Sequence, residues 1–591
     1  MINYLLMLVT ALLFYSPLYS QELKEMDILS REEWKAQSAQ DGLKWHIPRY
    51  ITIHHTGTYQ NPNRSAAEKL QALQKFSYTE GVLGDGVTLK KPWPDVPYHF
   101  YIAVDGTVAK GREIQYQGDS NTDYDLNGHA LIVVEGNFEK EKIKDIQYEK
   151  LEKLVIALAK KYKVPAEEIT GHKDQAQTTC PGEDLYKLLP QIREKVKGLE
   201  NPRVIIGAEQ LFSPEYEKLI KGKRVGLITN HTGLLPDGTH LIDLLNDHRD
   251  VDLTVLFGPE HGLRGEEDTH VADGVDKKTG LPIISLYGKL RKPTKEMLEK
   301  VDVLIFDIQD IGARYYTYIK TMLNVLEAAA EEGIPYIILD RPNPITGDYV
   351  DGPMGKPLES GSGIGNIPIT HGMTVGELAL MFNGKRKEKG LPTAELTVIP
   401  LKNYERNQWY DNTGLPWVKP SPNMLTLNTA IIYPATCLLE GTNYSEARGT
   451  MKPFEVLGDP WVDGEKLKEK LNSYNLKGVR FKSRSFVPDS IVDGIRIYPP
   501  KFLGEKCEGV EIVVTDRDNF QSAKAGIFIL HALLELYPDK FEWRNARMDG
   551  LLGTSKVREQ LQAGVSPEQI VKEWDDAEEY FRKKREKYLL Y

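Results

Sequence analysis

The sequence predicts an α/β protein with three domains: a mixed α/β domain, a domain with a parallel sheet, and a smaller α+β domain. Short β-rich runs alternate with amphipathic helices over residues 27–197. Four continuous apolar runs, separated by helical stretches, follow between 224 and 339. Apolar strands that alternate with helices are typical of a parallel sheet whose two faces are covered. Beyond about residue 430 helical and strand patterns mix without this alternation.

The first domain is expected to contain three strands and one long helix before a linker. The strands are predicted at 49–54, 99–104 and 130–134, where β-branched and aromatic residues gather. A helix is predicted at 148–162, because its leucines recur at helical spacing on one face. The polar segment 195–203, which contains Gly and Pro, is the predicted linker.

The second domain, 203–430, opens with the four apolar runs. These runs predict strands at 224–229, 253–257, 303–306 and 336–339. The clearest helix between them is 318–332. The third domain, 431–591, ends in a charged segment at 567–587, which we expect to be a helix with a solvated face.

Composition and charge exclude several functional classes. The chain has 591 residues, of which 41% are hydrophobic and 27% charged, and this is ordinary for a folded globular protein. The 75 basic and 85 acidic residues give a net charge of −10, so a broad nucleic-acid-binding surface is not expected. Three cysteines cannot form a disulfide framework.

The first twenty residues are predicted to be a signal peptide, 1–20. The apolar run from Leu5 to Tyr15 is too short to span a bilayer as a helix but has the length of a signal-peptide core. Cleavage is expected near Ser20, which gives an exported protein, periplasmic or secreted, with no stable membrane anchor. The alternatives are an uncleaved anchor and a buried first helix.

A candidate metal site lies in the first domain. His54 and His55 follow the predicted strand at 49–54, and His172 and Cys180 come much later in the chain. Two imidazoles and a thiolate, with water as the fourth ligand, form a catalytic zinc set that activates water at neutral pH. From spacing alone, a structural histidine pair and a buried cysteine that fills the core remain alternatives.

The first domain resembles the type 2 zinc N-acetylmuramoyl-L-alanine amidases and peptidoglycan-recognition proteins. The resemblance rests on ITIHHTG at 51–57, PYHFYIAVDGTVAKGR at 97–112, VVEGNF at 133–138 and GHKDQAQTTCPG at 171–182. It implies one Zn²⁺ held by His54, His172 and Cys180. It also implies that Tyr98 is the catalytic tyrosine, and that Thr178 stands where relatives carry Lys or Thr.

Two positions decide how far this family pattern applies to the chain. Val133 occupies a position where a subset of the family has Glu, and the nearby Glu135 does not inherit that role. Some relatives that lack the cysteine ligand bind peptidoglycan without cutting it. Because Cys180 is present, the resemblance favours catalysis over recognition alone.

Polar residues follow each predicted strand of the second domain. In a parallel α/β sheet ligands bind beyond the carboxyl ends of the strands, so these residues form one candidate site. They are Asn230, Glu260, His261, Arg264, Asp307, Gln309, Asp310, Arg314, Tyr315, Asp340 and Arg341. The glycines of 274–280 do not form a P-loop, so neither a nucleotide nor another cofactor is expected here. Carboxylates, arginines and tyrosines suit a polar, anionic sugar.

The second and third domains resemble the exo-β-N-acetylmuramidases of the NamZ type, which have a Rossmann-like domain and a smaller C-terminal domain. The matching segments are GLITNHTG, FGPEHGLRG, FDIQDIGARYYTY, LDRPNP, SPNM at 421–424, which contains Asn423, and LLEGTNYSEARGT at 438–450, which contains Glu440. The resemblance implies that Glu260 is the catalytic acid. We expect Arg264 and Arg314 to hold the lactate carboxylate, because guanidinium binds carboxylate bidentately. Ala447 stands where glycine is expected.

Together the two resemblances imply a bifunctional peptidoglycan hydrolase that acts on peptidoglycan and muropeptide fragments. The amidase would cleave the bond between N-acetylmuramic acid (MurNAc) and L-alanine. The exo-muramidase would then release MurNAc from the non-reducing end of the peptide-free glycan. The alternatives are a zinc amidase fused to a non-catalytic sugar-binding module, an endo-acting lysozyme and an N-acetylglucosaminidase.

Overall fold

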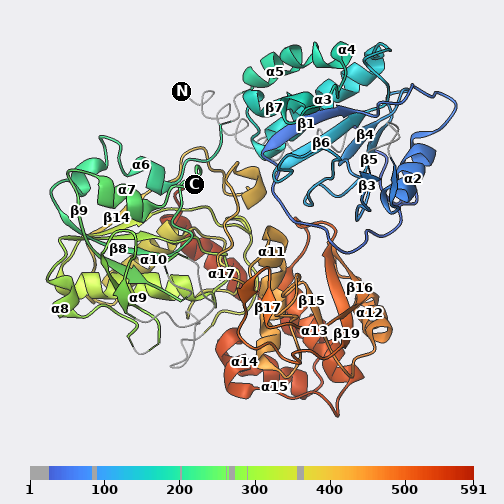
Figure 1. Ribbon diagram of the computed structural model, residues 1–591. Coiled ribbons are helices and arrows are strands. Elements are labelled where there is room, and N and C mark those ends of the chain that lie inside the picture. The colour runs from blue at the N-terminus through green and yellow to red at the C-terminus, as the bar shows by residue number, and fades with distance from the viewer. Residues whose placement is uncertain are drawn as a thin grey trace, which may run out of the picture. The chain divides into compact units, whose positions relative to one another are not determined.

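The computed structural model describes residues 26–82, 89–199, 202–260, 263–264, 273–288, 290–355 and 365–591 (Figure 1). The predicted signal peptide, 1–20, lies outside the described residues. The chain divides into two compact units. Unit 1 comprises the residues up to Arg203 together with Asp411–Trp417, and unit 2 comprises Val204–Tyr410 and Val418–Tyr591.

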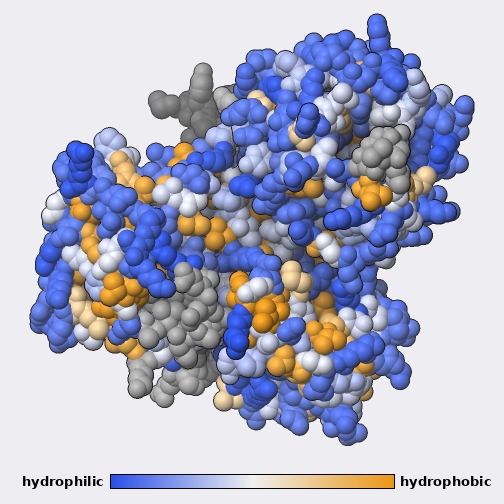
Figure 2. All heavy atoms as spheres, in the orientation of Figure 1, coloured by the Kyte–Doolittle hydropathy of each residue, from blue (hydrophilic) through white to orange (hydrophobic). Residues whose placement is uncertain are grey.

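The described surface is mixed in character. The visible face in Figure 2 is mainly hydrophilic, and its hydrophobic residues form separate small groups. Among the described residues, no helix combines the length and the apolar composition needed to cross a bilayer.

Unit 1 is built around a five-stranded sheet in the order β5-β4-β6-β1-β7. Its strands and helices are β1 (Tyr50–His55), α2 (Ala66–Ser77), β2 (Gly81–Val82), β3 (Leu89–Lys90), β4 (Phe100–Ile102), β5 (Val108–Lys110), β6 (His129–Val134), α3 (Asp145–Tyr162), η1 (Ala166–Glu168), β7 (Ile169–Gly171), η2 (His172–Asp174), α4 (Glu183–Tyr186) and α5 (Leu189–Lys197). Strand β1 pairs in parallel with β6 and β7. The three predicted strands and the long helix therefore exist, and α5 extends into the predicted linker.

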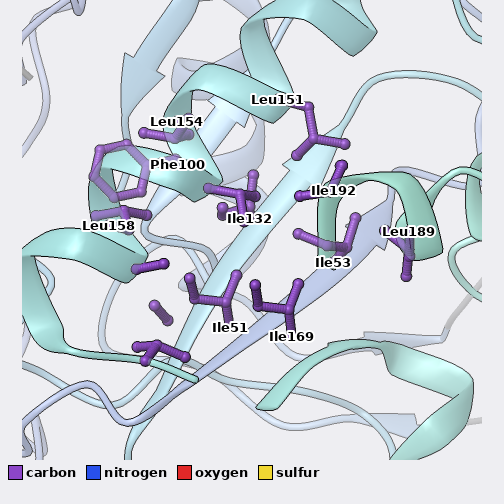
Figure 3. Close-up of a cluster of buried hydrophobic side chains, with 14 of the residues drawn as sticks. Ile51, Ile53, Phe100, Ile132, Leu151, Leu154, Leu158, Ile169, Leu189 and Ile192 are labelled. Atoms are coloured by element: carbon purple, nitrogen blue, oxygen red, sulfur yellow. The ribbon is translucent and has the colours of Figure 1, made fainter. Parts of the chain in front are cut away.

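Apolar side chains hold α3 and α5 against one face of this sheet (Figure 3). Leu151, Leu154 and Leu158 of α3 are at most 1% exposed, because the helical repeat places them on the same side. They meet Ile53 and Ile132 of the sheet. Full burial of one such side chain stabilises the fold by about 1.5–3 kcal/mol. This core fixes the strand ends that carry the candidate metal ligands.

Unit 2 contains a seven-stranded sheet in the order β10-β11-β9-β8-β12-β13-β14. The elements of this part are α6 (Gly207–Gln210), η3 (Glu217–Leu219), β8 (Arg224–Thr229), α7 (Leu241–Asp247), β9 (Asp252–Gly258), β10 (Gly274–Val275), β11 (Pro282–Ser285), α8 (Lys295–Leu298), β12 (Val303–Asp307), α9 (Thr317–Glu332), β13 (Tyr336–Leu339), α10 (Val375–Glu388) and β14 (Leu396–Ile399). All neighbouring strands are parallel except β10 and β11. The predicted parallel-sheet α/β fold is confirmed.

The strand order reverses at β8. The chain leaves β8 toward β9 and β11 on one side, then returns to β12 and continues outward through β13 and β14 on the other. Because such crossovers are right-handed, α7 and α9 cover opposite faces of the sheet. The loops after β8 and β12 therefore diverge, and such a reversal point is where ligands bind in open α/β sheets.

The C-terminal part of unit 2 has a three-stranded antiparallel sheet in the order β15-β19-β16. Its elements, with the connection to it, are η4 (Tyr410–Asn412), α11 (Leu427–Thr436), η5 (Cys437–Gly441), β15 (Val456–Asp459), α12 (Gly464–Ser473), β16 (Val479–Phe486), β17 (Ile491–Val492), β18 (Ile495–Arg496), β19 (Cys507–Val514), α13 (Ser522–Leu536), α14 (Asn545–Leu552), α15 (Lys556–Gln562), α16 (Pro567–Lys572), α17 (Asp575–Arg585) and η6 (Glu586–Tyr588). This mixture confirms the predicted α+β class.

The charged segment at 567–587 differs from the expected solvated helix. It forms two helices, α16 and α17, and α17 packs Phe581 into the core with no exposed surface. Arg585 donates to the carbonyls of Gly347 at 2.8 Å and His371 at 3.1 Å. The segment is mostly charged, yet it contributes a buried phenylalanine and a buried arginine. Composition alone therefore does not predict that this segment packs into the core.

A buried ion pair joins two strand ends of unit 2. Arg341 donates through Nε to Asp307 Oδ1 at 2.6 Å and through a terminal nitrogen to Oδ2 at 3.0 Å. The side chains are 6% and 0% exposed. The pair connects the ends of β12 and β13, so Asp307 and Arg341 partner each other at the edge where they were predicted to bind substrate.

Replacement of Asp307 by Asn should destabilise unit 2 by about 3–5 kcal/mol, because it leaves a buried guanidinium without its counter-charge. Urea unfolding would measure the loss, and the transition of unit 1 should not move. Asp302→Asn is the matched control, since Asp302 pairs with Arg224 at the surface, where a pair is worth about 1 kcal/mol or less. Equal effects of the two substitutions would contradict the prediction.

Candidate functional site

Parallel pairing in unit 1 brings the candidate metal ligands together. Ile53 pairs with Gly171 across β1 and β7, so the next residues, His54 and His172, leave the sheet side by side. Their ring centroids lie 4.3 Å apart. The loop after η2 returns Cys180 to them, with its sulfur 3.7 Å from His54 Nδ1. The candidate ligand atoms of the three residues lie within 4.8 Å of one another, and all three side chains are buried.

The protonation states of this cluster suit a cation. Burial lowers the pKa of His172 to about 4 and holds the pKa of His54 well below its usual value, so both imidazoles are neutral near pH 7. Burial raises the pKa of the Cys180 thiol to about 12, while the backbone N–H of His55, 3.3 Å from the sulfur, opposes this rise. A bound cation would displace the thiol proton, as metal binding to cysteine requires.

Neighbouring hydroxyl groups orient the cluster. The Thr122 hydroxyl lies 2.6 Å from His172 Nε2, which leaves Nδ1 for a metal. His54 Nε2 is buried without a hydrogen-bond partner among the described residues. The Thr178 hydroxyl accepts the backbone N–H of Cys180 at 3.2 Å, so this residue positions the sulfur-bearing loop.

Two tyrosines border the cluster. The ring of Tyr98 lies 5.2 Å from that of His54, and the ring of Tyr124 lies 5.4 Å from that of His172. Burial and the nearby Cys180 raise the pKa of both phenols, so both remain hydrogen-bond donors at neutral pH. The cluster therefore combines two nitrogen ligands, one sulfur ligand and phenolic donors, which is a donor set that fits Zn²⁺.

The acidic residue near this site has a structural role. Glu135 forms an ion pair with Lys69 at 2.7 Å and accepts backbone N–H groups from Asn61 and Val104, each at 2.9 Å. Val133 is fully buried in β6. Glu135 is thus committed to three partners and is not available as a base at the metal.

A second candidate site lies at the reversal point of the unit 2 sheet. Glu260 follows β9 and accepts a hydrogen bond from the Thr317 hydroxyl at 3.0 Å. The Tyr287 hydroxyl also hydrogen-bonds to Glu260, and this bond with burial raises the pKa of the phenol. The Tyr316 hydroxyl lies in the field of both Glu260 and Asp310. A partly buried carboxyl group therefore stands near hydroxyl groups from two segments, the one after β11 and the one that leads into α9.

Buried polar atoms without a partner occur in the segments that follow β8 and β12 and at Asn423. Five buried atoms at this edge have no hydrogen-bond partner among the described residues: Asn230 Nδ2, Gln309 Oε1, Asp310 Oδ1, the Tyr316 hydroxyl and Asn423 Nδ2. Each of these side chains is at most 8% exposed. An unsatisfied buried polar atom costs about 1–3 kcal/mol, so these groups await water or a polar ligand.

Comparisons with known proteins agree with the two sites. The NamZ exo-β-N-acetylmuramidase N-terminal and C-terminal family models match residues 225–428 and 431–591. The peptidoglycan β-N-acetylmuramidase NamZ of Bacillus subtilis is 45% identical over 396 residues, which cover 66% of this chain and 92% of that protein. This chain belongs to the NamZ family. A crystal structure of a DUF1343 family protein from Bacteroides fragilis, 36% identical, covers 66% of this chain and 99% of its own, with a TM-score of 0.60.

A second family is joined to the NamZ part. The N-acetylmuramoyl-L-alanine amidase model matches residues 44–183. Peptidoglycan-recognition protein SD of Drosophila melanogaster is 30% identical over 179 residues, which cover 28% of this chain and 86% of that protein. The chain is therefore a fusion of an amidase-type domain with both NamZ domains, and the families point to hydrolysis of peptidoglycan.

The two predicted carboxylate-binding arginines of the NamZ part differ in how far the protein itself uses them. Arg314 is 1% exposed and donates to four main-chain carbonyls, those of Pro353, Ile367, Leu551 and Leu552, at 2.6–2.9 Å. Because its terminal nitrogens are used and its side chain is buried, Arg314 is not free to bind a substrate carboxylate, which corrects its predicted role. Arg264 donates to Asp276 at 2.7 and 2.9 Å and to Asp243 at 3.0 Å, and its side chain is 27% exposed.

Other predicted substrate residues also serve the fold. The Tyr315 hydroxyl is buried and donates to Pro434 O at 2.5 Å. Asp340 is fully buried and accepts from Thr374, Gly376 and Tyr591 at 2.7–2.8 Å. Glu440 binds two arginines. His261 lies outside the described residues.

Sequence reasoning missed several residues at the two sites. Thr122 and Tyr124 lie in a polar loop without secondary structure, so no periodicity marks them. Tyr287 follows β11, a short strand that begins with Pro282 and pairs at the edge of the sheet. The rule that polar residues gather after strands would have found Tyr287 if β11 had been predicted.

Cys180→Ser should abolish tight metal binding, because a neutral hydroxyl is a much poorer zinc ligand than a thiolate. Elemental analysis of the purified protein should find about one metal ion per chain in the wild type and almost none in the variant. Cys507→Ser, which changes a buried cysteine of unit 2, is the matched control and should retain the metal. Wild-type metal content in Cys180→Ser would contradict the assignment.

Proposed function

We propose that the chain is a bifunctional peptidoglycan hydrolase with a zinc-dependent N-acetylmuramoyl-L-alanine amidase in unit 1 and an exo-β-N-acetylmuramidase in unit 2. The complete ligand set of His54, His172 and Cys180 is the observation that carries the amidase assignment. For the muramidase it is Glu260 among hydroxyl donors beside unpartnered polar atoms. The proposal includes export to the periplasm or the exterior, where peptidoglycan lies.

In the amidase, the residues of unit 1 would hold the ion and complete the site around the scissile amide. The chemistry that zinc supplies when bound is polarisation of a carbonyl and activation of water near neutral pH. Thr122 holds His172 through Nε2, and Thr178 fixes the loop of Cys180. Tyr98, which stays protonated, would donate to the oxygen of the attacked carbonyl as negative charge develops there.

In the muramidase, Glu260 would protonate the glycosidic oxygen of the leaving sugar. General acid catalysis of this kind contributes about 10²–10⁴-fold. Thr317 and Tyr287 orient the carboxyl group, and the unpartnered amides of Asn230 and Asn423 would hydrogen-bond to the sugar. Asp310 has one unpartnered oxygen at the same edge and is the second carboxylate that this site can offer.

The two reactions would follow one another. The amidase removes the stem peptide and leaves the lactyl group of MurNAc as a free carboxylate. An exo-acting enzyme that recognises this carboxylate would act only after the peptide has gone. The first reaction therefore produces the substrate of the second, which explains the fusion better than two independent activities do.

A non-catalytic sugar-binding role for unit 2 is the alternative. It requires the polar atoms around the sugar but no titratable group at the scissile bond. The position of Glu260 beside two hydroxyl donors, at the reversal point of the sheet, favours catalysis.

Tyr98→Phe should lower amidase turnover by about 10²–10³-fold, which is the usual loss when one oxyanion donor is removed. The assay would follow release of L-alanyl peptides from muropeptides, with metal content measured in parallel. Tyr101→Phe is the matched control, because the hydroxyl of Tyr101 hydrogen-bonds to Glu135. A normal rate in Tyr98→Phe with full metal content would reduce Tyr98 to a packing residue.

Glu260→Gln should abolish release of MurNAc from a MurNAc-terminated disaccharide, since the amide keeps the shape but cannot donate the proton. Amidase activity should be unchanged, and the disaccharide should still bind. Glu299→Gln, an exposed change in the same sheet domain, serves as the control. Near wild-type hydrolysis by Glu260→Gln would transfer the role to Asp310, because Asp307 is paired with Arg341.

A further inference from the structure

We propose that Arg547 of α14 binds the lactyl carboxylate of the terminal MurNAc and so makes unit 2 selective for peptide-free glycan. This inference rests on the proposed muramidase function. It replaces the sequence-based expectation that Arg264 and Arg314 bind this carboxylate.

Helix α14 is fastened to the loop that carries the candidate acid's partners. Arg314, in the loop between β12 and α9, donates to the carbonyls of Leu551 and Leu552 at 2.9 and 2.8 Å. The same loop continues into Thr317, which hydrogen-bonds to Glu260. Arg314 therefore positions a helix of the C-terminal part against the catalytic edge of the sheet.

The start of α14 is held on a second side. The backbone N–H of Arg544 donates to Gly441 O at 2.8 Å, where η5 ends. A side chain at Gly441 would meet Met548 at 2.8 Å, so glycine permits this close approach. These contacts and those of Arg314 fix both ends of α14, and Arg547 lies between them.

Arg547 is anchored at one side and open at the other. Its guanidinium forms an ion pair with Glu440, whose side chain is 15% exposed, while the Arg547 side chain is 44% exposed. Among the described residues this is its only ion pair or side-chain hydrogen bond. Its charge acts on Tyr287, whose hydroxyl bonds to Glu260. Arg547 thus lies near the tyrosine that hydrogen-bonds to the candidate acid.

Arg547 has fewer carboxylate partners than the cations beside it. Glu440 also binds Arg448 at 2.6 Å, and Glu446 binds Arg448 at 3.1 Å and Lys501 at 3.0 Å. Lys501 also acts on the buried Asp459. Among the described residues Arg547 therefore has one carboxylate partner, Glu440, which it shares with Arg448. Arg547 is the most exposed of the three cations, because the side chains of Arg448 and Lys501 are 29% and 16% exposed. A carboxylate of the ligand would give Arg547 a second acceptor.

The positive charge of Arg547 would distinguish MurNAc with a free lactyl group from the two related sugars that unit 2 can meet. A free lactyl group offers a carboxylate that guanidinium can bind through two hydrogen bonds. A lactyl group still joined to a peptide is a neutral amide, and N-acetylglucosamine has no lactyl group. Binding at Arg547 would therefore favour the product of the amidase over both of the other sugars.

The test compares 4-nitrophenyl β-MurNAc with its lactyl carboxamide, using the full-length protein. Wild type should prefer the acid. Arg547→Gln should raise KM for the acid by about 10- to 100-fold, the usual loss for a charged hydrogen-bonded pair, and leave the carboxamide unaffected. The ratio of the two kcat/KM values should fall by the same factor, and Arg547→Lys should lie between.

Two arginines serve as matched controls. Arg544→Gln changes an exposed arginine at the start of the same helix, and Arg291→Gln changes another exposed cation that acts on Tyr287. Both should keep the wild-type ratio. Equal losses on both substrates in Arg547→Gln, an unchanged ratio, or loss of discrimination in Arg291→Gln alone would overturn the inference. If wild type released 4-nitrophenol from neither compound, the muramidase function itself would fail.

Discussion

The parallel pairing of neighbouring strands is the constraint on which both sites depend. In unit 1 the pairing of β1 with β7 sets His54 and His172 at the same edge of the sheet, although 117 residues separate them in the sequence. In unit 2 the strand order reverses at β8, and β8 pairs in parallel with β9, whose carboxyl end leads into Glu260. The apolar strands must be buried on both faces, so the edge at their carboxyl ends is where polar side chains can gather.

Most of the fold could be predicted from the sequence because it depends on local patterns. The runs at 224–229 and 336–339 coincide with β8 and β13. The short strands β10 and β11 were missed, because strands of two to four residues carry little periodicity. The helices of the charged C-terminal segment were misjudged, because one buried Phe581 decides their packing and the charges around it dominate the composition.

The candidate sites were less predictable than the fold, because the sequence shows which residues reach a strand end but not which partners they meet there. Arg314 and Arg264 stand where a ligand-binding arginine would stand. The partners of Arg314 come from segments far away in the chain, such as Leu551 O, and those of Arg264 are Asp243 and Asp276 from the flanking segments. Whether a guanidinium is used inside the protein or left for a ligand is a property of tertiary contacts. Arg547 was overlooked for the same reason, since no motif marks its helix.

The arginines of unit 2 show which charges the fold uses for its own contacts and which remain open to a ligand. Burial lowers the pKa of Arg314 and Arg585 to about 10, so both remain protonated near neutral pH. Each has its charge dispersed over main-chain carbonyls, and neither is left for a ligand. Arg547 differs because, among the described residues, Glu440 is its one carboxylate partner and its side chain is 44% exposed. On this view the order of the two proposed reactions needs no contact between the units. Cleavage of the amide converts a neutral lactyl amide into an anion, and the exposed guanidinium of Arg547 would then distinguish processed from unprocessed glycan.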